Sequence, residues 1–120
     1  MTRERLRLGE EGENLAARYL EEHGYRVVAR RWQGAGREID LVVEKAGVVA
    51  FVEVKTRRSP IAPPATAVNW RKRRQLAAAA LAASERWRGR SFRFDVVSVE
   101  LWPDGPRIEH LVDAFRLDGF

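Results

Sequence analysis

Hydrophobic and polar positions follow a helical period in two stretches of the chain. Over residues 8–23, Glu13, Ala16, Ala17 and Leu20 fall on one stripe, and Gly24 follows as a C-terminal stop signal. A second helix is predicted over residues 68–87. Its inner stripe consists of Lys72, Leu76, Ala79, Ala80, Ala83 and Trp87.

The remaining apolar segments are rich in β-branched and aromatic residues and predict strands. They lie at residues 25–32, 38–43, 48–55 and 91–101, with a fifth strand at 106–115. Residues 45–47 supply a hairpin turn, and the proline-containing segment 57–67 is predicted to be a loop. The order of elements predicts an α/β fold in which a mixed central sheet is flanked by helices.

Composition limits the classes of protein to which this chain can belong. Its 120 residues predict a single domain, 1–120. The chain has 22 Lys and Arg residues against 17 Asp and Glu residues, which gives a formal net charge of +5. This balance suits contact with a polyanion such as nucleic acid. With no cysteine, disulfides and Cys-ligated zinc are excluded. No signal peptide or membrane-spanning run is recognised, so a cytoplasmic protein without membrane association is expected.

Candidate chemistry is concentrated at one end of the predicted hairpin. Asp40 lies in its first strand, and Glu53, Val54 and Lys55 lie in its second. Strand side chains alternate, so Glu53 and Lys55 share one face, and Asp40 can lie a few ångströms away on the neighbouring strand. Two carboxylates and the Val54 carbonyl oxygen are ligands that suit Mg²⁺, with Mn²⁺ as an alternative. A phosphodiesterase site follows, in which Lys55 orients and stabilises as a cation.

Further residues are expected around this site. Glu13 is predicted to point from the first helix toward the same sheet face, as an additional ligand or through a water molecule. A basic rim that grips backbone phosphates without sequence specificity is predicted from the loop and the start of the second helix. It comprises Arg57, Arg58, Arg71, Lys72, Arg73 and Arg74.

The arrangement of these motifs resembles the PD-(D/E)xK nuclease superfamily. The matching stretches are residues 12–25, 38–42, 51–57 and 93–99, with Lys72 at the head of the second helix. Within the superfamily, the chain is most similar to the YraN-like family of small bacterial proteins, which in turn resembles archaeal Holliday junction resolvases. The resemblance implies a restriction-endonuclease-like α-β-β-β-α-β core and a metal-dependent endonuclease. Structured or branched DNA is the expected substrate, in preference to RNA. Symmetric cutting of a junction implies a homodimer.

Each of these residues also has a simpler explanation. A Glu in the first helix is often a dipole-favoured acid, Lys72 often an extended lysine that covers apolar surface, and a basic run often a solvated helix face. Asp95 fits a structural strand acid paired to an arginine better than a catalytic one, and His110 receives no role. At the level of function, the alternatives are a non-catalytic nucleic-acid-binding module with the nuclease fold, or a subunit that binds an acidic protein.

Overall fold

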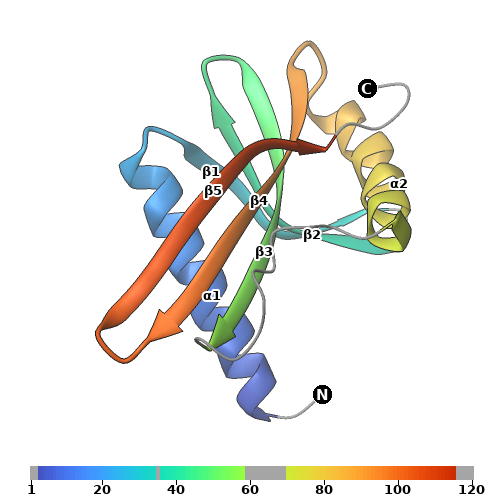
Figure 1. Ribbon diagram of the computed structural model, residues 1–120. Helices are drawn as coiled ribbons and strands as arrows, with labels where there is room; N and C mark the ends of the chain where they lie inside the picture. Colours follow the sequence, from blue (N-terminus) through green and yellow to red (C-terminus); the bar gives the residue numbers. More distant parts are fainter. Residues whose placement is uncertain (1–2, 35, 59–69, 116–120) are drawn as a thin grey trace.

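Two helices and five strands form within the described part of the chain, in the order that the hydrophobic pattern predicts (Figure 1). The computed structural model describes residues 3–34, 36–58 and 70–115, without the side chains of 4–6, 70–73 and 75. The elements are α1 (Arg3–Glu22), β1 (Arg26–Gly34), β2 (Arg37–Lys45), β3 (Val48–Arg58), α2 (Trp70–Arg86), β4 (Ser91–Trp102) and β5 (Gly105–Phe115).

The five strands form one mixed sheet in the order β1-β2-β3-β4-β5. All neighbouring pairs are antiparallel except β3 and β4, which run parallel because α2 lies between them in the chain. The predicted turn between β2 and β3 is confirmed: Ala46 and Gly47 both have positive φ angles, 51° and 79°, as a two-residue hairpin turn requires.

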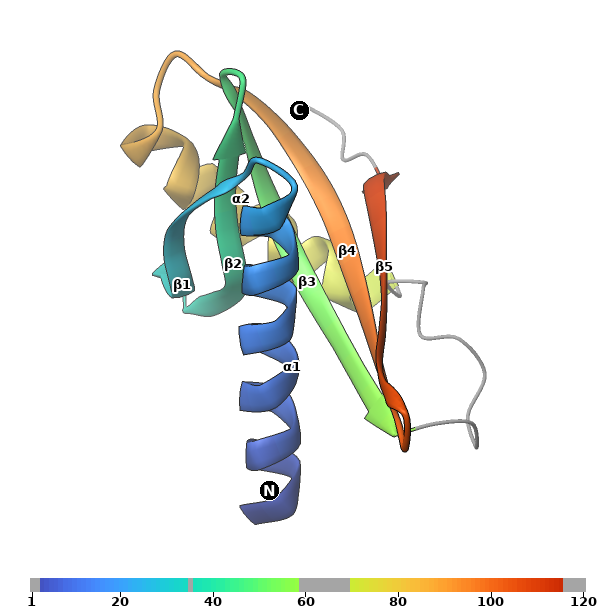
Figure 2. The ribbon, with the colours of Figure 1, turned by 90° about the vertical axis from the view of Figure 1, so that its left-hand side faces the viewer.

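The sheet separates two hydrophobic cores, one under each helix. Ala16, Ala17 and Leu20 of α1 are fully buried against one face, in the order predicted from the first stripe. Leu76, Ala79, Ala80 and Ala83 of α2 are buried against the other face. Figure 2, in which α1 lies in front of the sheet and α2 behind it, shows the three layers.

The helix α1 comes very close to β3 at Gly12. A Cβ atom at this position would lie 1.8 Å from Oγ1 of Thr56 and 2.7 Å from its Cβ. Glycine is therefore needed here for contact, since its lack of a side chain lets the helix backbone approach the strand. This contact fixes α1 over the C-terminal end of β3, where the candidate site residues lie.

Two predicted boundaries are wrong. The helix α1 begins at Arg3 rather than at residue 8, because its first turns consist of good helix formers that carry no apolar stripe. Arg57 and Arg58 belong to β3 rather than to a loop, because parallel pairing with β4 continues to Arg58 opposite Leu101. The rest of the predicted loop, residues 59–67, lies outside the described residues. No helix in the described part of the chain is long and apolar enough to cross a membrane.

Candidate active site

The site begins where β2 separates from β3. Pairing between these strands runs from the hairpin turn only as far as Leu41 opposite Val52, and beyond this point the strands diverge (Figure 1). Asp40 is the next residue of β2. Its Oδ2 accepts a hydrogen bond from the backbone N–H of Val54, with an N–O distance of 2.8 Å. A side-chain bond thus holds the carboxylate of Asp40 against the Glu53-Val54-Lys55 segment.

Glu53 and Lys55 lie on the same face of β3, as the alternation of strand side chains predicts. The Nζ atom of Lys55 is 3.4 Å from Oε1 of Glu53. The side chain of Glu53 is only 6% exposed, whereas that of Lys55 is 32% exposed. The buried acid therefore has a cationic neighbour that also reaches solvent.

A cavity of about 420 Å³ opens beside these residues. Asp40, Val54 and Lys55 line it from the sheet, together with Thr56, and Glu13 lines it from α1. Glu13 does lie at the predicted site, but its carboxylate is bound to Arg31 of β1. The Nε and Nη2 atoms of Arg31 lie 3.1–3.3 Å from the two Glu13 oxygens.

The donor chemistry of this cavity suits a hard divalent cation. Asp40 lines the cavity with a carboxylate bonded to the backbone N–H of Val54, and Glu53 precedes Val54 on the same strand, its buried carboxylate next to Lys55. Among the described residues, no three acidic or histidine side chains are gathered as a metal-binding group. An ion held here would need water or phosphate oxygens to complete its shell, which is the usual situation for Mg²⁺.

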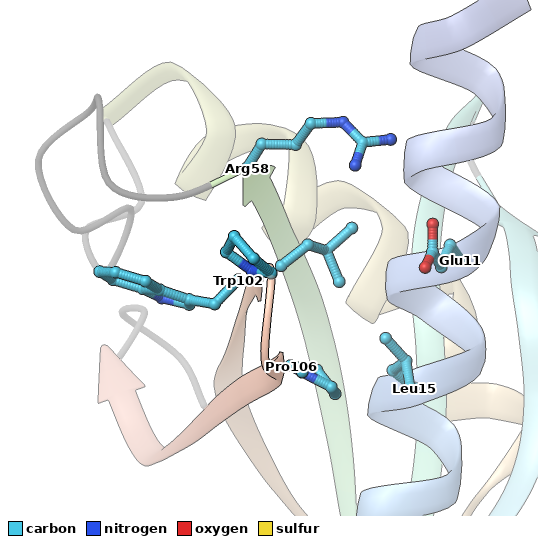
Figure 3. A pocket seen from close by; sticks show the side chains of 8 residues that line it. Glu11, Leu15, Arg58, Trp102 and Pro106 are labelled. Atoms are coloured by element: carbon cyan, nitrogen blue, oxygen red, sulfur yellow. The ribbon is translucent and has the colours of Figure 1, made fainter.

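The predicted basic rim is only partly assembled in the structure. Arg57 is 14% exposed and forms an ion pair with Glu100, its cross-strand partner on β4. Arg58 is exposed and extends from the end of β3 toward α1, over a groove of about 480 Å³ that Glu11 and Leu15 also line (Figure 3). Arg74 is exposed on α2. The side chains of Arg71, Lys72 and Arg73 lie outside the described set.

Comparison with known proteins places the chain in a family. The profile of the uncharacterised protein family UPF0102 matches residues 12–99, which contain every acidic candidate and Lys55. The chain belongs to this family. It is the YraN-like group that the motifs resemble.

Relatives from several bacteria match almost the whole chain. A UPF0102 protein of Geobacter metallireducens is 43% identical over 113 residues, covering 92% of this chain and 93% of the relative. One from Geobacter sulfurreducens is 45% identical over 115 residues, covering 92% and 89%. One from Nocardia farcinica is 44% identical over 112 residues, covering 90% and 88%. The names of these relatives state no activity.

A second polar cluster in this UPF0102 chain surrounds Asp95 of β4, which is fully buried. Arg93 donates two hydrogen bonds of 2.8 Å to its carboxylate, and Nε2 of His110 lies 2.7 Å from Oδ2. The backbone N–H of Asp113 and the hydroxyl of Tyr25, which binds Arg93, complete the network. Burial raises the pKa of Asp95, but the hydrogen bonds from His110, Arg93 and Asp113 outweigh it and hold the pKa below its ordinary value.

The Asp95 cluster answers two questions that the sequence left open. Asp95 has the arginine partner expected of a structural strand acid. His110, to which no role was assigned, is a partner of the same carboxylate. What brings His110 to Asp95 is the β4–β5 register. It pairs His110 with Val97, which lies two residues from Asp95 on the same face of β4. That register cannot be read from the sequence because β5 is irregular between Leu111 and Phe115.

Proposed function

We propose that this protein is a metal-dependent endonuclease that hydrolyses phosphodiester bonds in structured or branched DNA. The observation that carries the proposal is the hydrogen bond from the Val54 N–H to the Asp40 carboxylate. It joins the acid of one strand to the Glu-x-Lys segment of the next, beside a cavity that also contains Lys55. The fold is compatible with the α-β-β-β-α-β core of the nuclease superfamily.

Each residue has a role in this proposal. Asp40, Glu53 and the Val54 carbonyl would hold a Mg²⁺ or Mn²⁺ ion, which would activate water and neutralise charge on the phosphate. Lys55 contacts the phosphate or the attacking water as a cation, because its ammonium group reaches both Glu53 and solvent. Arg58 supplies a phosphate contact at the edge of the site, and two copies of the chain would cut the two strands of a junction symmetrically.

Cleavage of a labelled four-way junction, a flap and a linear duplex tests the proposal. Activity should require Mg²⁺ or Mn²⁺ and disappear in EDTA. Glu53→Gln and Asp40→Asn should reduce the cleavage rate by at least ~100-fold, the upper range for residues that merely support metal ligands. Thermal unfolding of each variant would show that the loss reflects the site and not the fold.

Glu38→Gln is the matched control, because Glu38 also lies on β2 but is exposed and hydrogen-bonded to Gln33. It should cleave like the wild-type protein. If Glu53→Gln cleaved as fast as Glu38→Gln, the proposed site would be wrong. Junction binding without cleavage in any divalent metal would instead support the alternative, a non-catalytic nucleic-acid-binding module.

A further inference from the structure

Two consecutive arginines of β1 both contact α1. The Nη1 atom of Arg30 lies 2.7 Å from Oδ1 of Asn14, and Arg31 binds both carboxylate oxygens of Glu13. Neighbouring residues of a regular strand point to opposite faces. Arg30 and Arg31 nonetheless contact the same helix, and the strand is irregular at Arg31. Its φ angle of 47° lies in the left-handed region that residues with a side chain rarely adopt.

This unusual backbone places Arg31 across from the candidate metal ligand. In the β1–β2 register, Arg30 pairs with Leu41 and Trp32 pairs with Ile39, so the residue opposite Arg31 is Asp40. Paired strands lie about 5 Å apart, which brings Arg31 to the edge of the site. Strained backbone of this kind is concentrated at functional positions in proteins.

Glu13 stands between the two arginines and the candidate site. It lines the cavity that contains Asp40, Val54 and Lys55, and it also lines a second cavity with Arg30 and Arg31. Its side chain is 15% exposed, whereas that of Arg31 is 49% exposed. The Arg31 side chain is therefore half exposed to solvent, where an anion can approach it, while its guanidinium holds Glu13.

We propose that Arg31 couples metal binding to nucleic-acid binding at this site. A backbone phosphate of the substrate replaces Glu13 on the Arg31 guanidinium, and the released carboxylate turns into the shared cavity toward Asp40. This exchange supplies the third acidic side chain that the described residues do not otherwise gather. The inference rests on the proposed function, and Arg31 acts in it as a positioning residue for Glu13.

The exchange is chemically reasonable on both sides. A guanidinium binds phosphate and carboxylate with the same two-pronged geometry, so a phosphate can take the place of Glu13 without moving Arg31. A hard divalent cation prefers carboxylate oxygen and keeps several waters that an incoming carboxylate can replace. Linkage then requires that metal and nucleic acid strengthen each other's binding by the same factor.

Fluorescence anisotropy with a labelled four-way DNA junction tests this coupling. Junction affinity is measured in EDTA and in Ca²⁺ at matched ionic strength. Ca²⁺ is chosen because it takes the same oxygen ligands as Mg²⁺. The wild-type protein should bind roughly tenfold more tightly with Ca²⁺, within the ordinary range of coupling between two sites. In Arg31→Gln, this Ca²⁺-dependent gain in junction affinity should be smaller by a factor of about three or more. The reason is that Glu13 has no Arg31 to release it, so DNA binding no longer changes its position.

Arg30→Gln is the matched control. It removes the same charge from the neighbouring residue, but that residue binds Asn14 rather than Glu13. It should bind the junction more weakly in both solutions and keep the full Ca²⁺ gain. Titration of the DNA-free proteins with Mn²⁺ provides a second measurement: Arg31→Gln should bind Mn²⁺ more tightly than wild type, and Arg30→Gln should not.

Equal Ca²⁺ gains in Arg31→Gln and Arg30→Gln would overturn the inference. So would weaker Mn²⁺ binding by Arg31→Gln, which would indicate a purely structural role for the ion pair. Failure of the coupling is distinguishable from failure of the proposed function. A wild-type protein that cleaves DNA with Mg²⁺ but shows no Ca²⁺ gain loses only the coupling, and one with the gain but no cleavage loses only the catalysis.

Discussion

At the scale of single residues, the fully buried carboxylate of Asp95 depends on its hydrogen-bond partners for its stability in the fold. Its carboxylate receives hydrogen bonds from Arg93, His110 and the backbone of Asp113, from both β4 and β5. Buried carboxylates are tolerated only when such partners replace water. The cluster therefore ties the edge strand β5 to its neighbour β4.

We expect Asp95→Asn to lower the free energy of unfolding by roughly 3 kcal/mol at pH 7, because it leaves the charge of Arg93 uncompensated. The pKa of Asp95 is lowered in the folded state. Its stabilising effect is therefore fully present above the unfolded pKa of about 3.9 and is lost as pH falls through the lower folded value. Urea unfolding of both proteins between neutral and acidic pH should show the difference shrinking below about pH 4.

Asp104→Asn serves as the control for this measurement. Asp104 lies in the β4–β5 turn with a 76% exposed side chain, 3.8 Å from Arg107. Such surface pairs contribute little, so its effect should stay below about 1 kcal/mol. An Asp95→Asn variant that is as stable as Asp104→Asn would refute a structural role for the cluster.

At the scale of whole elements, the site depends on how closely α1 approaches β3. Gly12→Ala should lower the free energy of unfolding by roughly 1–3 kcal/mol, because the added Cβ overlaps Thr56 and forces the helix from the strand. The displacement would also move Glu13, the next residue along the helix. Denaturant unfolding measures the first effect.

Gly9→Ala in the same helix should have the opposite sign. A Cβ at Gly9 meets no atom within 4 Å. Replacing a helical glycine by alanine in open space should stabilise the protein by about 0.5–1 kcal/mol. If both variants changed stability equally, propensity rather than contact would explain Gly12.

Prediction from sequence succeeded for elements with a strong period and failed where contacts decide. The Ala16–Leu20 stripe follows from the helical period and the Glu53–Lys55 face from strand alternation, and both are confirmed. The pairing of Glu13 with Arg31 could not be predicted, because it depends on a left-handed residue inside a strand. The ion pair of Arg57 with Glu100 likewise depends on the β3–β4 register, which joins residues 43 positions apart.

At the scale of the whole molecule, the sheet order explains why the candidate residues meet. Strands β2 and β3 pair near their hairpin and then diverge, while α1 crosses the far end of β3 at Gly12. Glu13 of α1, Asp40 of β2 and Lys55 of β3 thereby line one cavity, and Glu13 also lines a second cavity with Arg30 and Arg31 of β1. The metal, the substrate and a homodimer remain predictions built on this arrangement.

The location of a bound divalent ion tests the central claim most directly. Paramagnetic broadening of the amide NMR signals by Mn²⁺ should begin at Leu41, Val54 and Lys55 in the wild-type protein. The same signals should persist at equal Mn²⁺ in Glu53→Gln. Broadening centred elsewhere, or unchanged by Glu53→Gln, would contradict a metal site built from Asp40 and Glu53.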